Sequence, residues 1–330
     1  MQLIINTYGT YVHIKDELFE VRLKKDGKEE KHHFAGQKVT SILLSKGAAI
    51  STDAIILAMK NNIDIIVLEY DGMPVGRFWH SKPGSTSRIR KKQLEASLNE
   101  EGLKWIIKWL TTKTDNQIEL LKGLKKNRAS KAADIQEKID KITSMKDKIK
   151  SVKAKDVSSV DDSLRGWEGT AGRLYFQTLS ELLTERYRFS GRSFRPAKDP
   201  FNAFLNYAYG ILYSRVEKVL TIAGLDPFLG FMHRDDYNTK SLVFDFIEPY
   251  RIIAEEVVFK LFSAKKVNDS HSDKITNGYS LNTDGKNLLV QHFFKFFEEE
   301  KIRYKGRNQT RANAMQLDAH HFANQLIKQS

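Results

Sequence analysis

Short apolar runs separated by turn residues characterise roughly the first 80 residues of the chain and predict β-strands. The runs are rich in β-branched and aromatic residues, and glycine or Asp-Gly steps punctuate them. One segment has helical spacing instead, because Ser51 or Thr52 can cap a helix that continues over Ala54–Ala58. The expected strands are Leu3–Ile5, Tyr11–Ile14, Leu18–Leu23, His32–Phe34, Val39–Leu44, Ile63–Leu68 and Pro74–Trp79, with a hairpin turn at Asp26-Gly27.

From Arg88 onward the apolar residues recur at the helical period almost to the end of the chain. In one segment Ile135, Ile142 and Ile149 occupy one heptad position, and lysines fill the other faces. This pattern predicts one arm of a helical hairpin whose other arm surrounds Ile118–Leu124. The lysine-rich faces are typical of a solvated helix, and a DNA-contacting helix is the alternative.

The change of period coincides with a segment of linker composition, HSKPGSTS at residues 80–87. We therefore expect an α+β protein of two domains. A small, sandwich-like β-rich domain with one helix would span residues 1–80, a linker residues 81–87, and a larger all-α domain residues 88–330. A chain of 330 residues, 41% of them hydrophobic, is long and apolar enough for this organisation.

Charge narrows the choice of partner. The chain has 54 Lys and Arg residues against 41 acidic residues, and its formal net charge of +13 is spread along its length. Phosphate backbones are the usual partner of such a surface, because each neutralised phosphate releases a counterion. An anionic membrane is the competing partner, but no basic amphipathic terminus favours it, so we expect DNA and no membrane.

Cysteine is absent, which excludes disulfides and thiolate zinc sites and fits a reducing compartment. The amino-terminal sequence MQLIINTYG has neither the basic region nor the apolar run of a signal peptide. No apolar stretch reaches the roughly 20 residues that span a bilayer. From these features we expect a soluble, cytoplasmic protein.

Glu168 is the first candidate for chemistry. It lies in GWEGTAG, inside a helix that is expected to start at Ser159 or Asp161 and to run to Leu182. Glycines recur there at a spacing of three and cost helix stability, so we expect close approach by another backbone or by a ligand. The alternative is an exposed helical glutamate beside a helix crossing.

His233 and two acidic residues follow in apolar surroundings. His233 ends the apolar part of GLDPFLGFMHRDD, on a loop that begins after Gly224, and it is either a ligand or a hydrogen-bonded structural residue. Asp245 and Glu248 lie three residues apart in FDFIEPYR, where an unpaired buried carboxylate would be costly. A metal or a basic partner should therefore compensate them, and an ion pair of Glu248 with Arg251 is the alternative.

An imidazole with two or three carboxylates is a donor set that suits manganese or magnesium, and one or two ions are both possible. Such an ion can act on a phosphodiester, with Arg234, Lys240 and Arg251 as the expected DNA-binding residues. Neither GxxxxGK[ST] nor GxGxxG occurs, so a P-loop ATP site is not indicated. On a basic protein this pattern favours a metal-dependent enzyme of nucleic acid.

Five segments in a fixed order make the chain resemble the integrase of CRISPR spacer acquisition, the large DNA-joining nuclease of the adaptation module. They extend from Ala49 to Arg251 and are AISTDAIILAMKNNIDIIVLEYDGMPVGRF, GWEGTAGRLYF, DPFNAFLNYAYGIL, GLDPFLGFMHRDD and SLVFDFIEPYR. Each segment alone is modest evidence of kinship, but their combination is specific. The chain beyond about Lys260 carries little of the resemblance.

The resemblance implies a β-rich amino-terminal domain for dimerisation and partner contact, a helical carboxy-terminal domain and a homodimer. It also implies assembly with a small ferredoxin-like partner around a short DNA duplex. By the positions of the matching segments, it implies that Glu168, His233 and Glu248 are catalytic and bind Mn²⁺ or Mg²⁺, with Asp245 as an additional acidic residue near the site. Relatives often have aspartate where Glu248 stands, so this ligand is one methylene longer here.

We therefore expect a metal-dependent DNA endonuclease and integrase of CRISPR adaptation, which serves antiviral defence. A 3′-hydroxyl of a captured fragment would attack a phosphodiester of the repeat array, with the metal stabilising the developing charge. Two other functions fit the sequence. One is a structure-specific nuclease that acts on branched DNA in repair, and the other is a non-enzymatic DNA-binding scaffold in which Glu248 pairs with Arg251.

Overall fold

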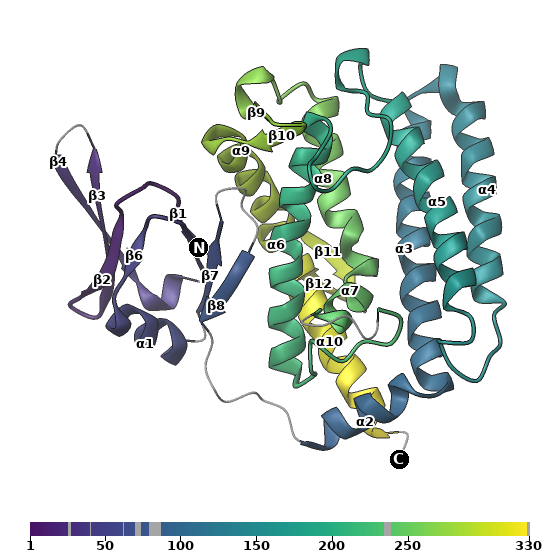
Figure 1. Ribbon diagram of the computed structural model, residues 1–330, viewed down its shortest axis with the longest axis horizontal. Helices are drawn as coiled ribbons and strands as arrows, with labels where there is room; N and C mark the ends of the chain where they lie inside the picture. The colour runs from purple at the N-terminus through teal and green to yellow at the C-terminus, as the bar shows by residue number, and fades with distance from the viewer. Residues whose placement is uncertain are drawn as a thin grey trace. The chain divides into compact units, whose positions relative to one another are not determined.

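The structure is a computed structural model that describes residues 1–25, 28–39, 41–61, 63–69, 74–78, 87–233 and 239–328 (Figure 1). The chain forms two compact units, residues 1–83 and residues 84–330. Some features of the sequence analysis fall outside the described ranges, namely Asp26-Gly27, Trp79, residues 81–86 of the expected linker and Arg234. Ser87, the last residue of that linker, is the first residue of helix α2 (Ser87–Ser97).

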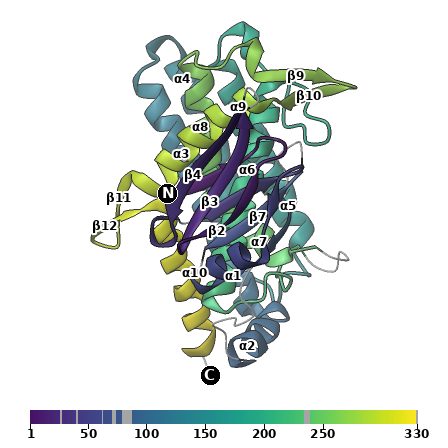
Figure 2. The same cartoon turned by 90° about the vertical axis from the view of Figure 1, so that its left-hand side faces the viewer.

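Two four-stranded sheets form most of the first unit (Figure 2). The first consists, in spatial order, of β1 (Gln2–Ile5), β5 (Ser41–Ser45), β7 (Asp64–Leu68) and β8 (Pro74–Phe78). The second consists of β4 (Lys28–Ala35), β3 (Leu18–Lys25), β2 (Tyr11–Lys15) and β6 (Ala49–Ile50). In the first sheet β1, β5 and β7 are parallel and β8 is antiparallel, whereas β4, β3 and β2 form an antiparallel meander.

An apolar core ties both sheets to helix α1 (Thr52–Lys60). Val12 and Ile65 from the strands and Ala54 from the helix are fully buried in it. Ser51 caps the helix, because its Oγ accepts a hydrogen bond from the amide of Ala54 at 3.2 Å. The predicted β-rich unit with one α-helix is confirmed for the described residues, although strand β6 and the 3-10 turn Gly36–Lys38 were not predicted.

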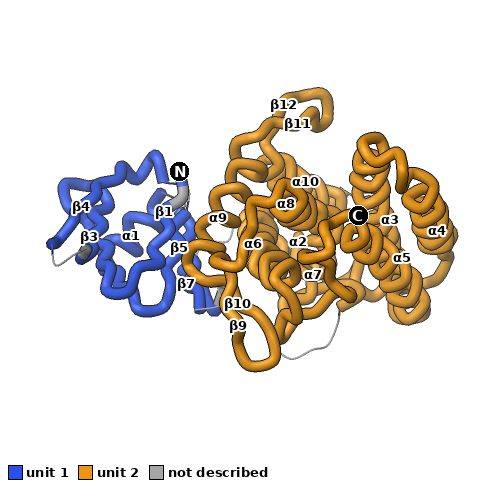
Figure 3. The backbone as a smooth tube through the Cα atoms, turned by 90° about the horizontal axis from the view of Figure 1, so that it is seen from above, with its two compact units in different colours: residues 1–83 blue, residues 84–330 orange. Residues whose placement is uncertain are grey.

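The second unit, orange in Figure 3, consists mainly of helices. After α2 they are α3 (Glu100–Lys126), α4 (Ala132–Lys150), α5 (Asp161–Glu181), α6 (Pro200–Ala223), α7 (Ser241–Phe246), α8 (Arg251–Ser263), α9 (Thr283–Phe294) and α10 (Arg311–Lys328). A π-helix (Lys295–Glu299) continues α9, and the 3-10 turns are η2 (Ala129–Lys131), η3 (Glu185–Tyr187), η4 (Glu248–Tyr250) and η5 (Asp269–His271). Two antiparallel hairpins complete the unit, β9 (Ser272–Ile275) with β10 (Gly278–Leu281), and β11 (Lys301–Tyr304) with β12 (Arg307–Thr310).

Helices α3, α4 and α5 lie side by side, with α4 in contact with both others (Figure 1). The apolar face of α4 buries four isoleucines, Ile135, Ile139, Ile142 and Ile149. The predicted helical hairpin is therefore confirmed, with α3 as its other arm. The helix predicted around Glu168 is also confirmed, since α5 begins at one of the two expected residues and ends one residue before Leu182.

Helix α6 delivers the chain to the loop that carries His233. Asp199 caps its first turn, because the Asp199 side chain accepts a hydrogen bond from the amide of Asn202 at 2.7 Å. It ends at Gly224, whose φ of 86° lies in the left-handed region that glycine adopts without a steric penalty. Gly224 thus stops the helix as predicted and turns the chain into the loop.

The two hairpins of the second unit were not predicted. Their strands are four residues long and mostly polar, so they lack an apolar alternation. Between β11 and β12 the turn residues Lys305 and Gly306 both have positive φ, 45° and 80°, and only the glycine is a usual turn signal. Among the described residues, we find no helix that combines the length and the apolar character of a membrane span.

Candidate active site

The loop that carries His233 is fastened by Gln93 of α2. The Gln93 side chain is fully buried. Its Nε2 donates to the carbonyls of Asp226 at 2.9 Å and Leu229 at 2.7 Å, and its Oε1 accepts from the amide of Asp226 at 2.9 Å. Further along the loop, the ring of Phe231 is completely buried. The path of the loop is therefore fixed before it reaches His233.

Asp245 of α7 organises the end of the same loop. Its Oδ2 accepts from the backbone amides of Phe231 at 2.6 Å and Met232 at 3.1 Å, and its Oδ1 accepts from the amide of His233 at 3.3 Å and from His233 Nδ1 at 2.7 Å. The carboxylate is completely buried, so these donors compensate its charge. Nδ1 donates to the carboxylate, so in the neutral imidazole Nε2 carries a lone pair, and the His233 side chain is 30% exposed. Asp245 thus fixes the position and orientation of His233.

Gly230 lets this loop pass close to α7. A Cβ at this position would lie 2.5 Å from Ser241 Cβ and 2.9 Å from Asp245 Oδ2. We expect Gly230→Ala to displace the loop and to lower the free energy of unfolding by about 1–3 kcal/mol, measured by chemical denaturation. The matched control is Gly169→Ala in α5, where an added Cβ would meet nothing within 4 Å and should not destabilise the helix. Equal stability of the two variants would contradict the tight packing at Gly230.

Lys113 of α3 joins two of the predicted catalytic residues. Its ammonium forms ion pairs with Glu168 on α5 and with Glu248 in η4, and the Nζ–Oε2 distance to Glu248 is 2.6 Å. The side chains of Lys113 and Glu248 are 10% and 6% exposed, whereas that of Glu168 is 31% exposed. One cation therefore lies between two carboxylates that are far apart in the sequence, and one of these carboxylates is accessible to solvent.

Glu248 is held by a second cation, Arg251. The Nε of Arg251 donates to Glu248 Oε1 at 2.7 Å, and its guanidinium lies 5.0 Å from the ring centroid of Tyr209. Burial alone would raise the pKa of Glu248, but the positive charges of Arg251 and Lys113 outweigh burial and lower the pKa to about 2. Glu248 is therefore ionised at neutral pH. The ion pair that the sequence analysis kept as an alternative is present.

The structure brings Glu168 and Glu248 together, and it ties His233 to the same region without bonding it to either. Arg165, one turn before Glu168 on α5, donates from Nη2 to the carbonyl of Met232 at 2.7 Å. His233 is the next residue. Within the ranges that the structure describes, no three His, Asp or Glu side chains are arranged as a metal site. The three-ligand site therefore stays a prediction.

Two observations of the structure nevertheless fit a divalent cation at this place. Glu168 and Glu248 already converge on a positive charge, the ammonium of Lys113. In addition, Oε2 of Glu248 is buried and lies 2.6 Å from this ammonium, in the position that a cation would take. Carboxylate oxygens and an imidazole nitrogen are ligands that Mn²⁺ accepts, and Mg²⁺ accepts the former.

The predicted DNA-binding residues differ in their surroundings. Lys240 pairs with Glu217 at 2.9 Å, and its side chain is half-exposed. Arg251 is largely buried and is engaged by Glu248. Arg234 lies outside the described residues. Contact of these side chains with DNA stays a prediction.

Gln93, Lys113 and Arg165 were not predicted from the sequence. A signal for Lys113 was available, because it continues the buried face of α3 at helical spacing after Trp109 and Leu110. A lysine on an apolar helix face requires a buried acidic partner, and such a partner would have been sought among Glu168 and Glu248.

The glycines of α5 do not make the close contact with another backbone that the sequence predicted. An added Cβ at Gly166 or Gly169 would meet no described atom within 4 Å, and one at Gly172 would meet only Glu168 Oε1, at 3.9 Å. The predicted contact with another backbone is therefore wrong for the described residues. The surface of α5 beside Glu168 is open instead, and approach by a ligand stays a prediction.

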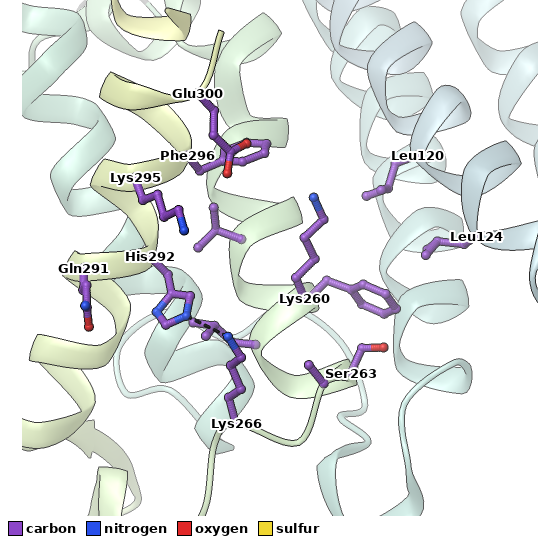
Figure 4. A pocket seen from close by; sticks show the side chains of 14 residues that line it. Leu120, Leu124, Lys260, Ser263, Lys266, Gln291, His292, Lys295, Phe296 and Glu300 are labelled. Carbon is purple, nitrogen blue, oxygen red and sulfur yellow. Dashed lines mark hydrogen bonds between the residues drawn. The ribbon is translucent and has the colours of Figure 1, made fainter. Parts of the chain in front are cut away.

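A pocket of about 600 Å³ lies elsewhere in the second unit, between α3, α8 and α9 (Figure 4). Leu120 and Leu124 line one side, and Lys260, His292 and Lys295 are among the residues that line the rest. None of the candidate catalytic residues contributes to its wall, so this pocket is separate from the candidate site.

A family model described as CRISPR associated protein Cas1 matches residues 3–295 of the chain. The chain belongs to the Cas1 family. A Cas1 relative from Archaeoglobus fulgidus, named CRISPR-associated endonuclease Cas1 1, is 31% identical over 330 residues, which cover 97% of this chain and 94% of the relative. The resemblance drawn from the five sequence segments is therefore confirmed.

Solved structures share the fold of this Cas1 chain. A structure described as a casposase bound to integration product matches with a TM-score of 0.84 and 22% identity, and the match covers 100% of this chain and 91% of that chain. A Cas6-RT-Cas1–Cas2 complex matches with a TM-score of 0.80 and 20% identity, over 100% of this chain and 35% of that chain. The predicted fold, a β-rich unit followed by a mostly helical unit, is thus confirmed as the Cas1 fold.

Proposed function

We propose that this chain is a metal-dependent DNA integrase and endonuclease that joins short DNA fragments into a CRISPR repeat array. The observation that carries the proposal is the convergence of Glu168 and Glu248 on one cation, beside a loop that presents Nε2 of His233. A relative named an endonuclease and a neighbour of the same fold bound to an integration product support DNA as the substrate. The net charge of +13 suits a phosphate backbone.

In the proposed mechanism Glu168, Glu248 and His233 hold Mn²⁺ or Mg²⁺, and Asp245 fixes the tautomer of His233. A bound ion of this kind polarises a phosphodiester and stabilises charge on its leaving oxygen. The 3′-hydroxyl of the fragment loses its proton and forms the new P–O bond while the bond to the 3′ oxygen of the repeat strand breaks, and that oxygen takes up a proton. Arg251 contributes further positive charge close to the ligands.

The proposal includes a homodimer, with the first unit in dimerisation and partner contact, and a small ferredoxin-like partner. A solved structure of the same fold is described as a complex that contains both Cas1 and Cas2, which supports an assembly of this kind. DNA would be held mainly through its phosphates, by Lys240 and Arg251 together with Arg234.

A branched DNA that imitates a half-integrated fragment tests this function. With Mn²⁺, we expect the purified protein to rejoin the target strand by transesterification, which a denaturing gel resolves. A substrate that lacks the attacking 3′-hydroxyl is the control and should yield no joined strand. Glu168→Gln should reduce joining at least about a hundredfold, because the amide no longer supplies a charged ligand.

Other outcomes of this experiment identify the alternative functions. Hydrolysis of the branched DNA without any joined strand would favour a structure-specific repair nuclease. DNA binding without cleavage, combined with a thermal stability that does not respond to Mn²⁺, would favour a non-enzymatic scaffold.

A further inference from the structure

We propose that the ammonium of Lys113 occupies the cation position between Glu168 and Glu248 in the metal-free protein, and that the divalent ion displaces it when the site is loaded. The inference rests on the proposed metal-dependent function. It adds a competitor for the metal that is part of the chain itself, so that Lys113 tunes how readily the site is loaded.

The first support is the position of Lys113 relative to both carboxylates. It reaches them from a third helix, α3, and contacts Glu168 and Glu248 at the same time. Its flexible four-carbon stem allows the ammonium to withdraw without movement of the helix. Asn116, one turn further along α3, donates to the carbonyl of Pro249 at 2.8 Å. This bond attaches η4 to α3 independently of Lys113, so Glu248 stays in place when the ammonium leaves.

The second support is the charge balance of the cluster. Lys113 and Arg251 carry one positive charge each, and Glu168 and Glu248 carry one negative charge each, so the four side chains are neutral together. A divalent ion that approached this neutral cluster would be repelled by the ammonium. When the ammonium withdraws, two carboxylates become available and attract the ion. If neither the divalent ion nor the ammonium lay between them, the two carboxylates would repel each other. Lys113 therefore also stabilises the metal-free protein.

The third support is the exposure of Glu168. Lys113 and Glu248 are almost completely buried, whereas Glu168 is partly exposed. The neighbouring positions on α5 leave space, because a Cβ at Gly169 would meet no described atom within 4 Å. An ion can therefore enter beside Glu168. The displaced ammonium then remains within one side-chain length of the site, where a DNA phosphate can pair with it.

Two substitutions of Lys113, expected to change Mn²⁺ affinity in opposite directions, test the exchange of the ammonium for the metal ion. The measurements are titration calorimetry with Mn²⁺ and thermal melting in the presence of a chelator. Lys113→Met should melt at a lower temperature without metal and bind Mn²⁺ at least about tenfold more tightly, since no ammonium opposes the ion. Lys113→Arg should keep the melting temperature and bind Mn²⁺ at least about tenfold more weakly, because a guanidinium holds carboxylates in a rigid, forked contact. The matched control is Lys146→Gln, which removes a lysine paired with Asp115 of α3 at 2.8 Å and should leave the affinity unchanged.

The outcomes separate this inference from the proposed function. Unchanged Mn²⁺ affinity in the Lys113 variants would overturn the exchange, while loss of binding in Glu168→Gln would still support the metal site. If Lys113→Met does not fold without metal, the arginine variant decides, and wild-type affinity in that variant contradicts the inference. Absence of Mn²⁺ binding by the unmodified protein and by Lys113→Met would overturn the proposed function as well.

Discussion

Replacement of His233 by alanine is expected to reduce strand joining at least about a hundredfold while the protein stays folded. The reason is the arrangement around Asp245. In the neutral imidazole Nε2 carries a lone pair, so alanine removes the proposed ligand. Asp245 still accepts hydrogen bonds from the backbone amides of Phe231, Met232 and His233, so the loop keeps its position. The measurements are the rate of joining on the branched substrate with Mn²⁺, the melting temperature and the affinity for DNA.

His292→Ala is the matched control for this experiment. It also removes a partly buried imidazole beside the separate pocket, whose Nδ1 donates to the carbonyl of Leu288 and whose Nε2 accepts from Lys266, and it should leave joining unchanged. Wild-type joining by His233→Ala would exclude His233 from the mechanism. A loss of stability as large as the loss of joining would identify His233 as a structural residue, the alternative that the sequence left open.

Asp245→Asn is expected to impair both the fold and the reaction. The carboxylate is fully buried and accepts from backbone amides on both oxygens, so the amide group of asparagine would direct N–H donors at other N–H donors. We expect the free energy of unfolding to fall by about 3 kcal/mol. Joining should fall about 10- to 100-fold, because residues that orient a metal-binding histidine have effects of this size. Chemical denaturation and the joining assay measure the two effects.

A second carboxylate of the same loop provides the control for Asp245. Asp226 is only half-buried, and its Oδ1 accepts one backbone hydrogen bond, from Phe228 at 3.0 Å, so Asp226→Asn should leave joining intact. If Asp245 acts on the reaction through His233, Asp245→Asn should reduce joining much less in a His233→Ala background. A full additional loss in the double variant would show that Asp245 contributes by another route.

Long helices of this chain could be predicted from sequence, because the spacing of their apolar residues indicates which side chains are buried. The isoleucines of α4 and the limits of α5 are examples, and both agree with the structure. The hairpins β9–β10 and β11–β12 could not be predicted in this way. Their strands are short and mostly exposed, and pairing between backbone groups rather than side-chain burial defines them.

The candidate site was only partly accessible to sequence reasoning. Glu168, His233 and Glu248 stand in unusual local surroundings, so they could be singled out, and two of them meet in the structure. The cation that joins these two is Lys113, and its place on the buried face of α3 indicates a buried acidic partner without showing that it contacts both carboxylates. Charge pairing of this kind depends on tertiary contacts that the order of residues does not reveal.

Helix α4 has a practical consequence for experiments on this enzyme. It contacts both α3 and α5, the helices that carry Lys113 and Glu168, through a buried apolar face. Lys141 and Lys148 lie on its exposed face. A fluorophore attached at either position would therefore be carried on a rigid support near the candidate site without entering it. Single-molecule recordings of DNA capture could use this helix as their reporter.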